Sequence, residues 1–226
     1  MAKGRGIVRG IAGLVGEVFI TVGVFLVAFV VWQLWWTDVV ADAEAADVVA
    51  RMESGTDDDA SWVHPKEVKL GDAFAIIRIP RFGAKYARPV YEGTSRAILQ
   101  RGVGHYPETV LPGEIGNYSM AGHRTTYGKP FNKIAELKDG DRIIIETVDT
   151  YYVYAVTGRE IVRPTQVSVV YPVPNDATAE PTQALLTMTS CEPMFSSRYR
   201  YVIHALLEGE YPKAGGLPTQ ILEVSQ

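Results

Sequence analysis

The chain has 226 residues, a formal net charge of −4 and 47% hydrophobic residues. This length suits one domain with an additional segment rather than two full domains, and the negative charge argues against nucleic-acid binding, which normally requires a basic face. The single cysteine, Cys191, excludes a disulfide within the chain and leaves one thiol as a candidate reactive group.

The first predicted element is a membrane-spanning helix at residues 18–36. Its sequence, VFITVGVFLVAFVVWQLWW, carries no formal charge, and about 20 apolar residues in a helix cross the ~30 Å hydrocarbon core of a bilayer. Lys3, Arg5 and Arg9 precede this helix, so the positive-inside rule places residues 1–17 in the cytoplasm. We therefore expect a single-pass membrane protein whose anchor contacts lipid and whose remaining residues are extracellular.

Two other interpretations of this apolar segment are open. A cleaved signal peptide has a shorter apolar region, of about 7–15 residues, although residues 41–43 (ADA) loosely resemble a cleavage site. A core helix of a soluble protein is rarely so uniformly apolar. The cluster of Trp32, Trp35 and Trp36 favours the anchor, because indole rings concentrate at membrane–water interfaces.

Residues 37–67 form the next predicted segment, an acidic extracellular linker. Residues 41–52 are predicted to form a polar helix, whereas residues 54–59, which contain three consecutive aspartates, are predicted to be flexible. Such an acidic run usually indicates a solvated stalk, and a calcium site is the alternative interpretation. We expect the stalk to hold the following domain away from the bilayer.

Residues 68–226 are predicted to form one all-β domain. A hairpin is expected around a turn at Asp149-Thr150, and residues 95–101 form the best helix candidate, with Thr94 as its cap. Many short strands and few helices indicate a sandwich or a barrel, which at this size buries a core without disulfides. Strands are expected at residues 74–79, 118–121, 142–146, 151–156, 160–162, 167–171, 184–189 and 201–207.

Two segments place chemically useful residues at predicted strand ends. In NYSMAGHR (residues 117–124), a glycine ends the strand and His123 projects into a loop, a common location for catalytic groups. In LLTMTSCEP (residues 185–193), the strand stops at Cys191 because Pro193 cannot continue a hydrogen-bonded ladder.

A third segment, SRYRYVIH (residues 197–204), places Arg198 and Arg200 on one face of an extended chain. Cysteine becomes a useful nucleophile when a base takes its proton, since the pKa of a free thiol is about 8.5. An imidazole takes that proton and returns one to a leaving amine, and a permanently charged arginine stabilises the tetrahedral intermediate. His123, Cys191 and Arg200 therefore suit acyl transfer.

Each of these residues also has an ordinary structural interpretation. A free cysteine is most often a small buried hydrophobic residue, and most arginines lie at the surface or in ion pairs. His64, His105 and His204 compete with His123 for the role of base. Metal binding has little support, because no two histidines have helical ligand spacing and there is no second cysteine. We expect neither a metal nor another cofactor.

Together, these segments resemble those of the sortase family. Residues 121–123 (AGH) resemble the segment of the catalytic histidine, and residues 187–191 (TMTSC) resemble the TLxTC signature of the catalytic cysteine. Arg200, nine residues after the cysteine, matches the catalytic arginine. The sequence departs from the signature at Met188 and Ser190, which are apolar-for-apolar and hydroxyl-for-hydroxyl replacements.

Within the family, LPGEIGN (residues 111–117) leading into AGHRTTYG (residues 121–128) resembles the class E sortases of actinobacteria. The resemblance, which covers roughly residues 70–210, implies an eight-stranded β-barrel. It also implies cleavage between Thr and Gly of an LPxTG- or LAxTG-type sorting signal in a secreted protein. The acyl group would then pass from Cys191 to an amine of a peptidoglycan precursor.

Substrate contacts are expected near the catalytic residues. His105 follows two closely spaced glycines, in a segment predicted to be a turn that lines the site. The residues expected to bind substrate are His105, Tyr118, Thr189, Ser190 and Arg198.

Alternative functions are also open. A sortase can polymerise pilins instead of anchoring proteins to the cell wall. L,D-transpeptidases place a His-Gly-Cys run around the nucleophile, which Ser190-Cys191-Glu192 lacks, and NlpC/P60-type peptidases have the cysteine before the histidine, whereas here it follows. The last alternative is a non-catalytic surface module in which Cys191 is merely buried.

Overall fold

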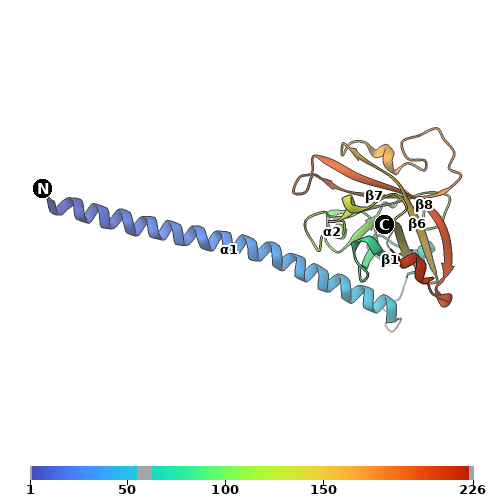
Figure 1. The fold of residues 1–226 in the computed structure, drawn as a ribbon, viewed down its shortest axis with the longest axis horizontal. Helices are drawn as coiled ribbons and strands as arrows, with labels where there is room; N and C mark the ends of the chain where they lie inside the picture. Colours follow the sequence, from blue (N-terminus) through green and yellow to red (C-terminus); the bar gives the residue numbers. More distant parts are fainter. Residues whose placement is uncertain (1, 55–62, 224–226) are drawn as a thin grey trace.

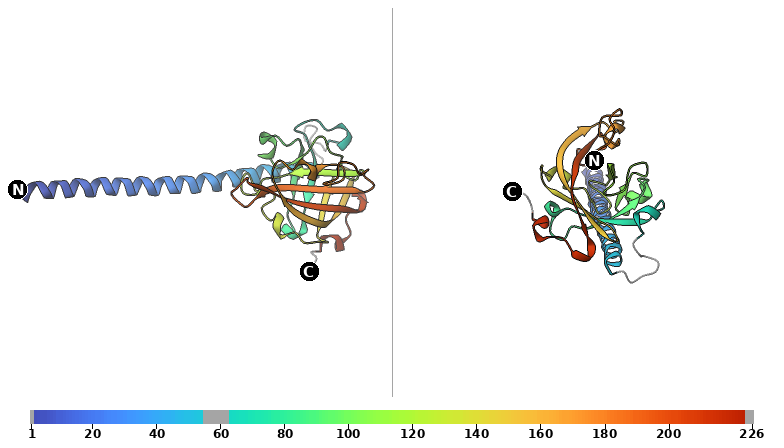
Figure 2. Two further views of the ribbon diagram at one scale, coloured as in Figure 1. Left: turned by 90° about the horizontal axis from the view of Figure 1, so that it is seen from above. Right: turned by 90° about the vertical axis from the view of Figure 1, so that its right-hand side faces the viewer.

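The computed structural model describes residues 2–54 and 63–223. They form one long helix, α1 (Ala2–Ser54), followed by a β-barrel (Figure 1). The N-terminal part of α1 extends away from the barrel in Figure 1 and in the left-hand view of Figure 2, and its C-terminal part lies alongside the barrel. Of the segment predicted to be flexible, only Ser54 is described, as the last residue of α1, and residues 55–59 lie outside the described residues.

Eight strands close into a barrel, as predicted. Their order around the barrel is β1-β2-β3-β4-β7-β8-β6-β5. The β2–β3 and β4–β7 pairs are parallel, and the remaining pairs are antiparallel. The strands are β1 (Ala73–Arg78), β2 (Arg88–Glu92), β3 (Val103–His105), β4 (Gly116–Ala121), β5 (Arg142–Glu146), β6 (Thr150–Val162), β7 (Ala184–Glu192) and β8 (Tyr199–Pro212).

The helices of the barrel domain are short and lie in its connections. They are α2 (Arg96–Leu99) and the 3-10 turns η1 (Pro65–Glu67), η2 (Pro80–Phe82), η3 (Ile134–Glu136), η4 (Val167–Val170), η5 (Lys213–Gly215) and η6 (Thr219–Leu222). The barrel interior is filled by alternate side chains of the strands, because successive residues of a strand point to opposite faces. Among the buried interior residues are Phe74, Ile77, Tyr118, Met120, Ile143, Ile145, Tyr154, Leu186, Met188 and Ile203.

Several element predictions need correction. The separate strand expected at residues 160–162 is the end of the long β6, and residues 167–171 form the turn η4, in which Val169 packs against the outer face of the sheet. β2 and β3 were not predicted, and the supposed turn before His105 is the three-residue strand β3. The cap of α2 is Ser95 rather than Thr94, since the Ser95 Oγ accepts a hydrogen bond from the Ile98 N–H (3.4 Å).

The first part of the acidic segment, from residue 37 to Ser54, is not a free stalk. Its helical residues Ala41, Ala45, Val49 and Met52 are buried, and their spacing places them on one face of α1. Val49 and Met52 pack against Ile76 of β1, on the outside of the barrel. The residues that the sequence predicted to form a polar helix therefore attach α1 to the barrel.

Candidate active site

Cys191 and Arg200 lie directly opposite each other on neighbouring strands. β7 and β8 are antiparallel, and their register pairs Cys191 with Arg200. Directly opposed residues project from the same face of a sheet, so both side chains point to one side. β7 runs one residue past Cys191, to Glu192, before the loop of residues 193–198 begins. Cys191 is partly exposed, which keeps its thiol accessible to a substrate.

His123 is brought to the same place by a parallel strand pair. β4 runs alongside β7, with Ala121 paired to Thr189. The Gly122 N–H donates a hydrogen bond to the Thr189 carbonyl (3.1 Å), which extends the contact beyond the end of β4. Since parallel strands advance together, the chain reaches His123 at the level of Cys191. Two segments more than 60 residues apart thereby place a candidate base at the same end of the sheet as a candidate nucleophile.

The three predicted catalytic residues line one cavity of about 260 Å³. Thr94, Leu99 and Tyr106 complete its wall from the segment between β2 and β4. These three were missed as site residues because β2 and β3, which carry that segment to the cavity, were not predicted. The full lining consists of Thr94, Leu99, Tyr106, Ala121, Gly122, His123, Thr189, Ser190, Cys191 and Arg200.

The environment of His123 favours the neutral imidazole. Burial lowers the pKa of His123 below its ordinary value, and the nearby positive charge of Arg96 lowers it further. The Nε2 atom is buried without a hydrogen-bond partner among the described residues, while the ring lies 5.2 Å from that of Tyr127. A neutral imidazole with an unengaged nitrogen can accept a proton from a thiol.

Arg124 is a residue of the site to which the sequence assigned no role. Its Nη1 donates a hydrogen bond to the Cys191 carbonyl (3.0 Å) and pairs with the Glu192 carboxylate. The Arg124 side chain is 7% exposed, and its guanidinium lies 5.5 Å from the ring centroid of Tyr201. Arg124 therefore ties the chain that follows β4 to the backbone of Cys191. Its position next to His123 was the only signal in the sequence.

Thr189 and Ser190, which the sequence suggested as substrate-binding residues, line the cavity, and both of their hydroxyls contact protein atoms. The Ser190 Oγ donates to the Gly122 carbonyl (2.9 Å). The Thr189 Oγ1 donates to the Met120 carbonyl (3.3 Å) and lies 3.2 Å from the Tyr106 hydroxyl. These bonds hold β7 against the end of β4.

His105 and Tyr118 do not line this cavity, contrary to prediction. His105 is 1% exposed, and its Nδ1 lies 2.7 Å from the Glu92 carboxylate. Its ring stacks on Tyr118, with 4.9 Å between centroids, and Tyr118 is fully buried. Both side chains belong to the barrel interior, because the alternation of β3 and β4 points them inward.

Arg198 does not line the cavity either. It is exposed in the loop before β8, with its guanidinium 5.3 Å from the ring centroid of Tyr199. Of the other two competing histidines, His64 lies at the second cavity described below, and His204 lies beside Glu160, with 2.9 Å between its Nε2 and the carboxylate.

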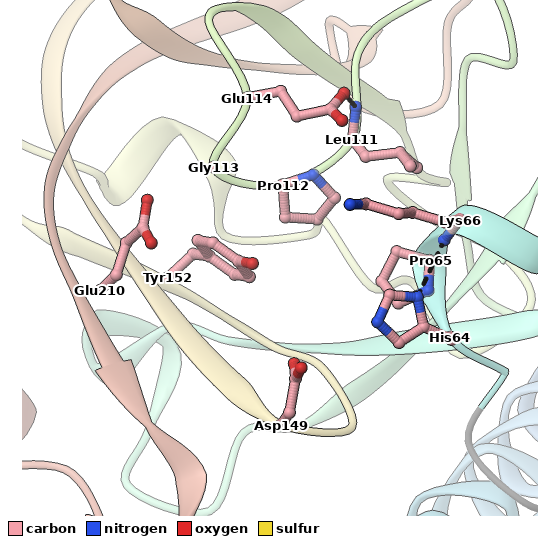
Figure 3. Close-up of a pocket in the computed structure, with 10 residues that line it drawn as sticks. All are labelled: His64, Pro65, Lys66, Leu111, Pro112, Gly113, Glu114, Asp149, Tyr152 and Glu210. Carbon is pink, nitrogen blue, oxygen red and sulfur yellow. Dashed lines mark hydrogen bonds between the residues drawn. The ribbon is translucent and has the colours of Figure 1, made fainter.

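A second cavity, of about 320 Å³, contains none of the predicted catalytic residues (Figure 3). In this cavity Gly113 packs closely against the ring of Tyr152. Its φ is +85°, and a Cβ at this position would lie 2.2 Å from that ring, so both the backbone angle and the close contact favour glycine. The cavity mixes both charges, with Lys66 facing the carboxylates of Glu114, Asp149 and Glu210, and it is also lined by His64. Within the described ranges, 2–54 and 63–223, no group of three or more His, Cys, Asp or Glu residues is arranged to hold a metal ion.

Comparison with known proteins identifies the relatives of this chain. The sortase domain family matches residues 77–208. Sortase SrtE1 of Streptomyces coelicolor is 37% identical over 217 residues, which cover 92% of this chain and 60% of that protein. Sortase SrtE2 of the same organism is 36% identical over 211 residues, covering 84% of this chain and 79% of that protein.

Solved structures agree with these sequence matches. Sortase E from Streptomyces avermitilis superimposes with a TM-score of 0.62 at 38% identity, covering 68% of this chain and 99% of that one. Sortase E1 from Streptomyces coelicolor, solved with a tripeptide in its active site, gives a TM-score of 0.61 at 34% identity and covers 67% of this chain and 96% of that one. The chain therefore belongs to the sortase family, whose members are cysteine transpeptidases, and its relatives include class E sortases.

Proposed function

We propose that the chain is a membrane-anchored transpeptidase that cleaves an LPxTG- or LAxTG-type sorting signal between Thr and Gly. The acyl group is held as a thioester on Cys191 and passes to an amine of a peptidoglycan precursor. The observation that supports this function is the meeting of His123, Cys191 and Arg200 on the wall of one cavity. These residues come from three strand ends, and together they supply a base, a nucleophile and a fixed positive charge.

The reaction follows from their chemistry. The neutral imidazole of His123 takes the thiol proton of Cys191, and the sulfur attacks the carbonyl carbon of the substrate threonine. The resulting oxyanion is stabilised by the guanidinium of Arg200. When the intermediate collapses, the imidazolium returns its proton to the departing glycine amine, leaving the thioester. An incoming amine then attacks the thioester, and its proton restores the thiol as the new amide forms.

Arg200 rather than Arg198 is assigned as the oxyanion donor. Its Nη1 donates hydrogen bonds to the carbonyls of Ser197 (3.1 Å) and Tyr199 (3.0 Å), which restrain the guanidinium. The strand pairing with Cys191 positions the backbone of Arg200. A donor is effective only when it is held in place before the reaction, because its contribution comes from preorganisation. Arg198 lacks both the cavity position and the strand partner.

The anchor is the apolar part of α1. Among the described residues, α1 is the one helix long and apolar enough to cross a membrane, and its most apolar stretch is entirely unburied. We place the membrane at residues 18–36, residues 1–17 in the cytoplasm and the catalytic domain, residues 68–226, outside. The helical residues 37–54 then join the anchor to the barrel.

The test is transpeptidation by the full chain in detergent, with LPxTG and LAxTG peptides and a nucleophilic amine. Wild-type protein should release the fragment that begins with glycine and form a thioacyl adduct visible by mass spectrometry. Cys191→Ala should form neither product. An adduct on the Cys191→Ala variant would contradict the assignment of the nucleophile. If the native thiol reacts with iodoacetamide only after unfolding, the chain is a non-catalytic module.

The two arginines provide a matched comparison. Arg200→Ala and Arg200→Lys should each lower kcat by about 10²–10³-fold without changing the melting temperature, since lysine keeps the charge but not the planar set of donors. Arg198→Ala should keep most of the activity. If Arg198→Ala is the inactive variant, the oxyanion donor is Arg198. If neither arginine matters, the role belongs to backbone amides.

A further inference from the structure

A large apolar cavity lies between α1 and the barrel, separate from the catalytic one. It has a volume of about 540 Å³, and its apolar walls are Val31 and Trp35 of α1 and Met194 and Phe195 of the β7–β8 loop, residues 193–198. Phe195 is 87% exposed, the largest exposed fraction of any large hydrophobic side chain among the described residues. A phenyl ring so exposed beside other apolar groups indicates a surface that another apolar body covers.

The position of α1 relative to the barrel is set by polar contacts next to this cavity. The Asp38 carboxylate accepts hydrogen bonds from the Gly128 N–H (3.2 Å) and from the Lys129 ammonium (2.8 Å). One turn further along, Asp42 pairs with Arg88 (2.6 Å). With α1 continuous through these residues, the barrel begins where the apolar stretch of the helix ends. The β7–β8 loop projects toward the same side as the N-terminal part of α1 (Figures 1 and 2).

We propose that the β7–β8 loop inserts Phe195 and Met194 into the headgroup region of the outer leaflet, beside Trp35. The proposal rests on the proposed membrane anchoring of α1. If residues 18–36 span the bilayer, Val31 and Trp35 lie within it or at its surface, and the cavity they share with Phe195 opens onto lipid. Aromatic side chains are favoured at this depth, where the ring contacts apolar chains next to polar headgroups.

The rest of the loop suits a lipid surface. Arg198 is exposed in the same loop, directly before β8, and its cation can pair with anionic headgroups. Cys191 precedes Phe195 by four residues, a length of chain that spans at most about 14 Å. The thiol is therefore held close to the membrane surface. A substrate or an acceptor that is itself attached to the membrane would reach the catalytic cavity without detaching.

A label at position 195 tests the proposal in the full chain. Cys191→Ala removes the only native cysteine, and Phe195→Cys in that background is labelled with an environment-sensitive fluorophore. The protein is reconstituted in vesicles of phosphatidylcholine and phosphatidylglycerol, with or without lipids that carry a quencher near the headgroup. The matched control is Ala214→Cys, exposed after β8, where Lys213 pairs with Glu146 at the far end of the barrel.

The label at position 195 should show blue-shifted emission and lose most of it to the quenching lipids, whereas the label at 214 should be unaffected. A label at Phe25, inside the apolar stretch, reports on the anchor separately through the blue shift of its emission in an apolar environment, without the quencher. If the label at 25 is blue-shifted and the label at 195 is neither blue-shifted nor quenched, the loop proposal is wrong while the anchoring stands. If neither label is blue-shifted in vesicles, the anchoring itself is wrong. Shielding of position 195 only when a membrane-bound substrate protein is added would mean that a protein covers the cavity, which also overturns the proposal.

A functional measurement complements the labels. Phe195→Ser keeps Cys191 and leaves the catalytic cavity unchanged, so cleavage of a soluble sorting peptide should match wild type. Cleavage of the same peptide tethered to vesicles should fall roughly tenfold, which corresponds to losing the burial of one phenyl group. Equal effects on soluble and tethered peptides would overturn the proposal, because they would indicate a direct contact between Phe195 and the peptide.

Discussion

Replacing Arg124 with alanine should destabilise the barrel and slow catalysis at the same time. In the native protein the Arg124 guanidinium binds the Cys191 carbonyl and the Glu192 carboxylate. The alanine variant leaves the carboxylate of Glu192, which is 21% exposed, without its counter-charge. Breaking a buried ion pair from one side costs about 3–5 kcal/mol, and the partial access of water to Glu192 favours the lower end of this range.

A loss of about 3 kcal/mol corresponds to a decrease in melting temperature of about 6–12 °C for a domain of this size. Circular dichroism of the full chain in detergent, at a wavelength dominated by the barrel aromatics, measures this change. Glu192→Ala removes the other half of the pair. The double variant should lose less unfolding free energy than the two single variants together, by at least about 1 kcal/mol, as expected for residues in direct contact.

The catalytic effect separates positioning from simple destabilisation. Arg124 holds the backbone of Cys191, the proposed nucleophile, and does not line the cavity. Well below the melting temperature, kcat should therefore fall while KM stays nearly constant. A displacement of about 1 Å in a reacting group costs roughly 100-fold in rate, which sets the scale. Arg124→Lys should recover part of both losses. A melting temperature within about 2 °C of wild type, or a change confined to KM, would refute this reasoning.

Three further predictions concern acid sensitivity, packing and topology. Because the pKa of His123 lies below its ordinary value of about 6.5, kcat/KM should rise with pH through that lowered pKa, and the pH–rate profile of the His123→Gln variant should lack this step. The free energy of unfolding should also decrease on acidification below pH ~6.5, because the unfolded chain takes up the proton at a higher pH than the folded chain does. Gly122→Ala places a Cβ 2.7 Å from the buried ring of Phe131 and should cost about 1–3 kcal/mol in a thermal melt, whereas Gly158→Ala, with nothing within 4 Å, should be nearly neutral. Protease added to intact protoplasts should remove the catalytic domain, and protection of that domain would mean that the orientation is reversed.

The sequence was sufficient for the features that depend on local pattern. The apolar run of α1 is visible from composition alone, because spanning a bilayer requires length and low polarity rather than particular contacts. Strands such as β1 and β5 follow from their β-branched residues and flanking turn signals. The three proposed catalytic residues were chosen from their types and order along the chain, and the barrel was predicted from the resemblance of their segments to one family.

Tertiary structure alone determined how these pieces meet. β3 is three residues long and contains Gly104, so no periodicity marks it, and it forms because β2 and β4 lie on either side of it. The location of His105 was mispredicted for the same reason, because the register of β3 decides whether this side chain points into or out of the barrel. Arg124 likewise acquires its role only when β4 and β7 pair, which brings Glu192 to its guanidinium.

The attachment of α1 to the barrel was also invisible in the sequence. Residues 41–52 look like a solvated polar helix, since buried alanines and a few valines between acidic residues make a weak apolar stripe. That stripe is buried because Ile76 projects from the outer face of β1 and meets Val49 and Met52, and because Arg88 supplies the charge that Asp42 requires. Ile76 lies on β1 and Arg88 on β2, so the contact exists only when these two strands have paired.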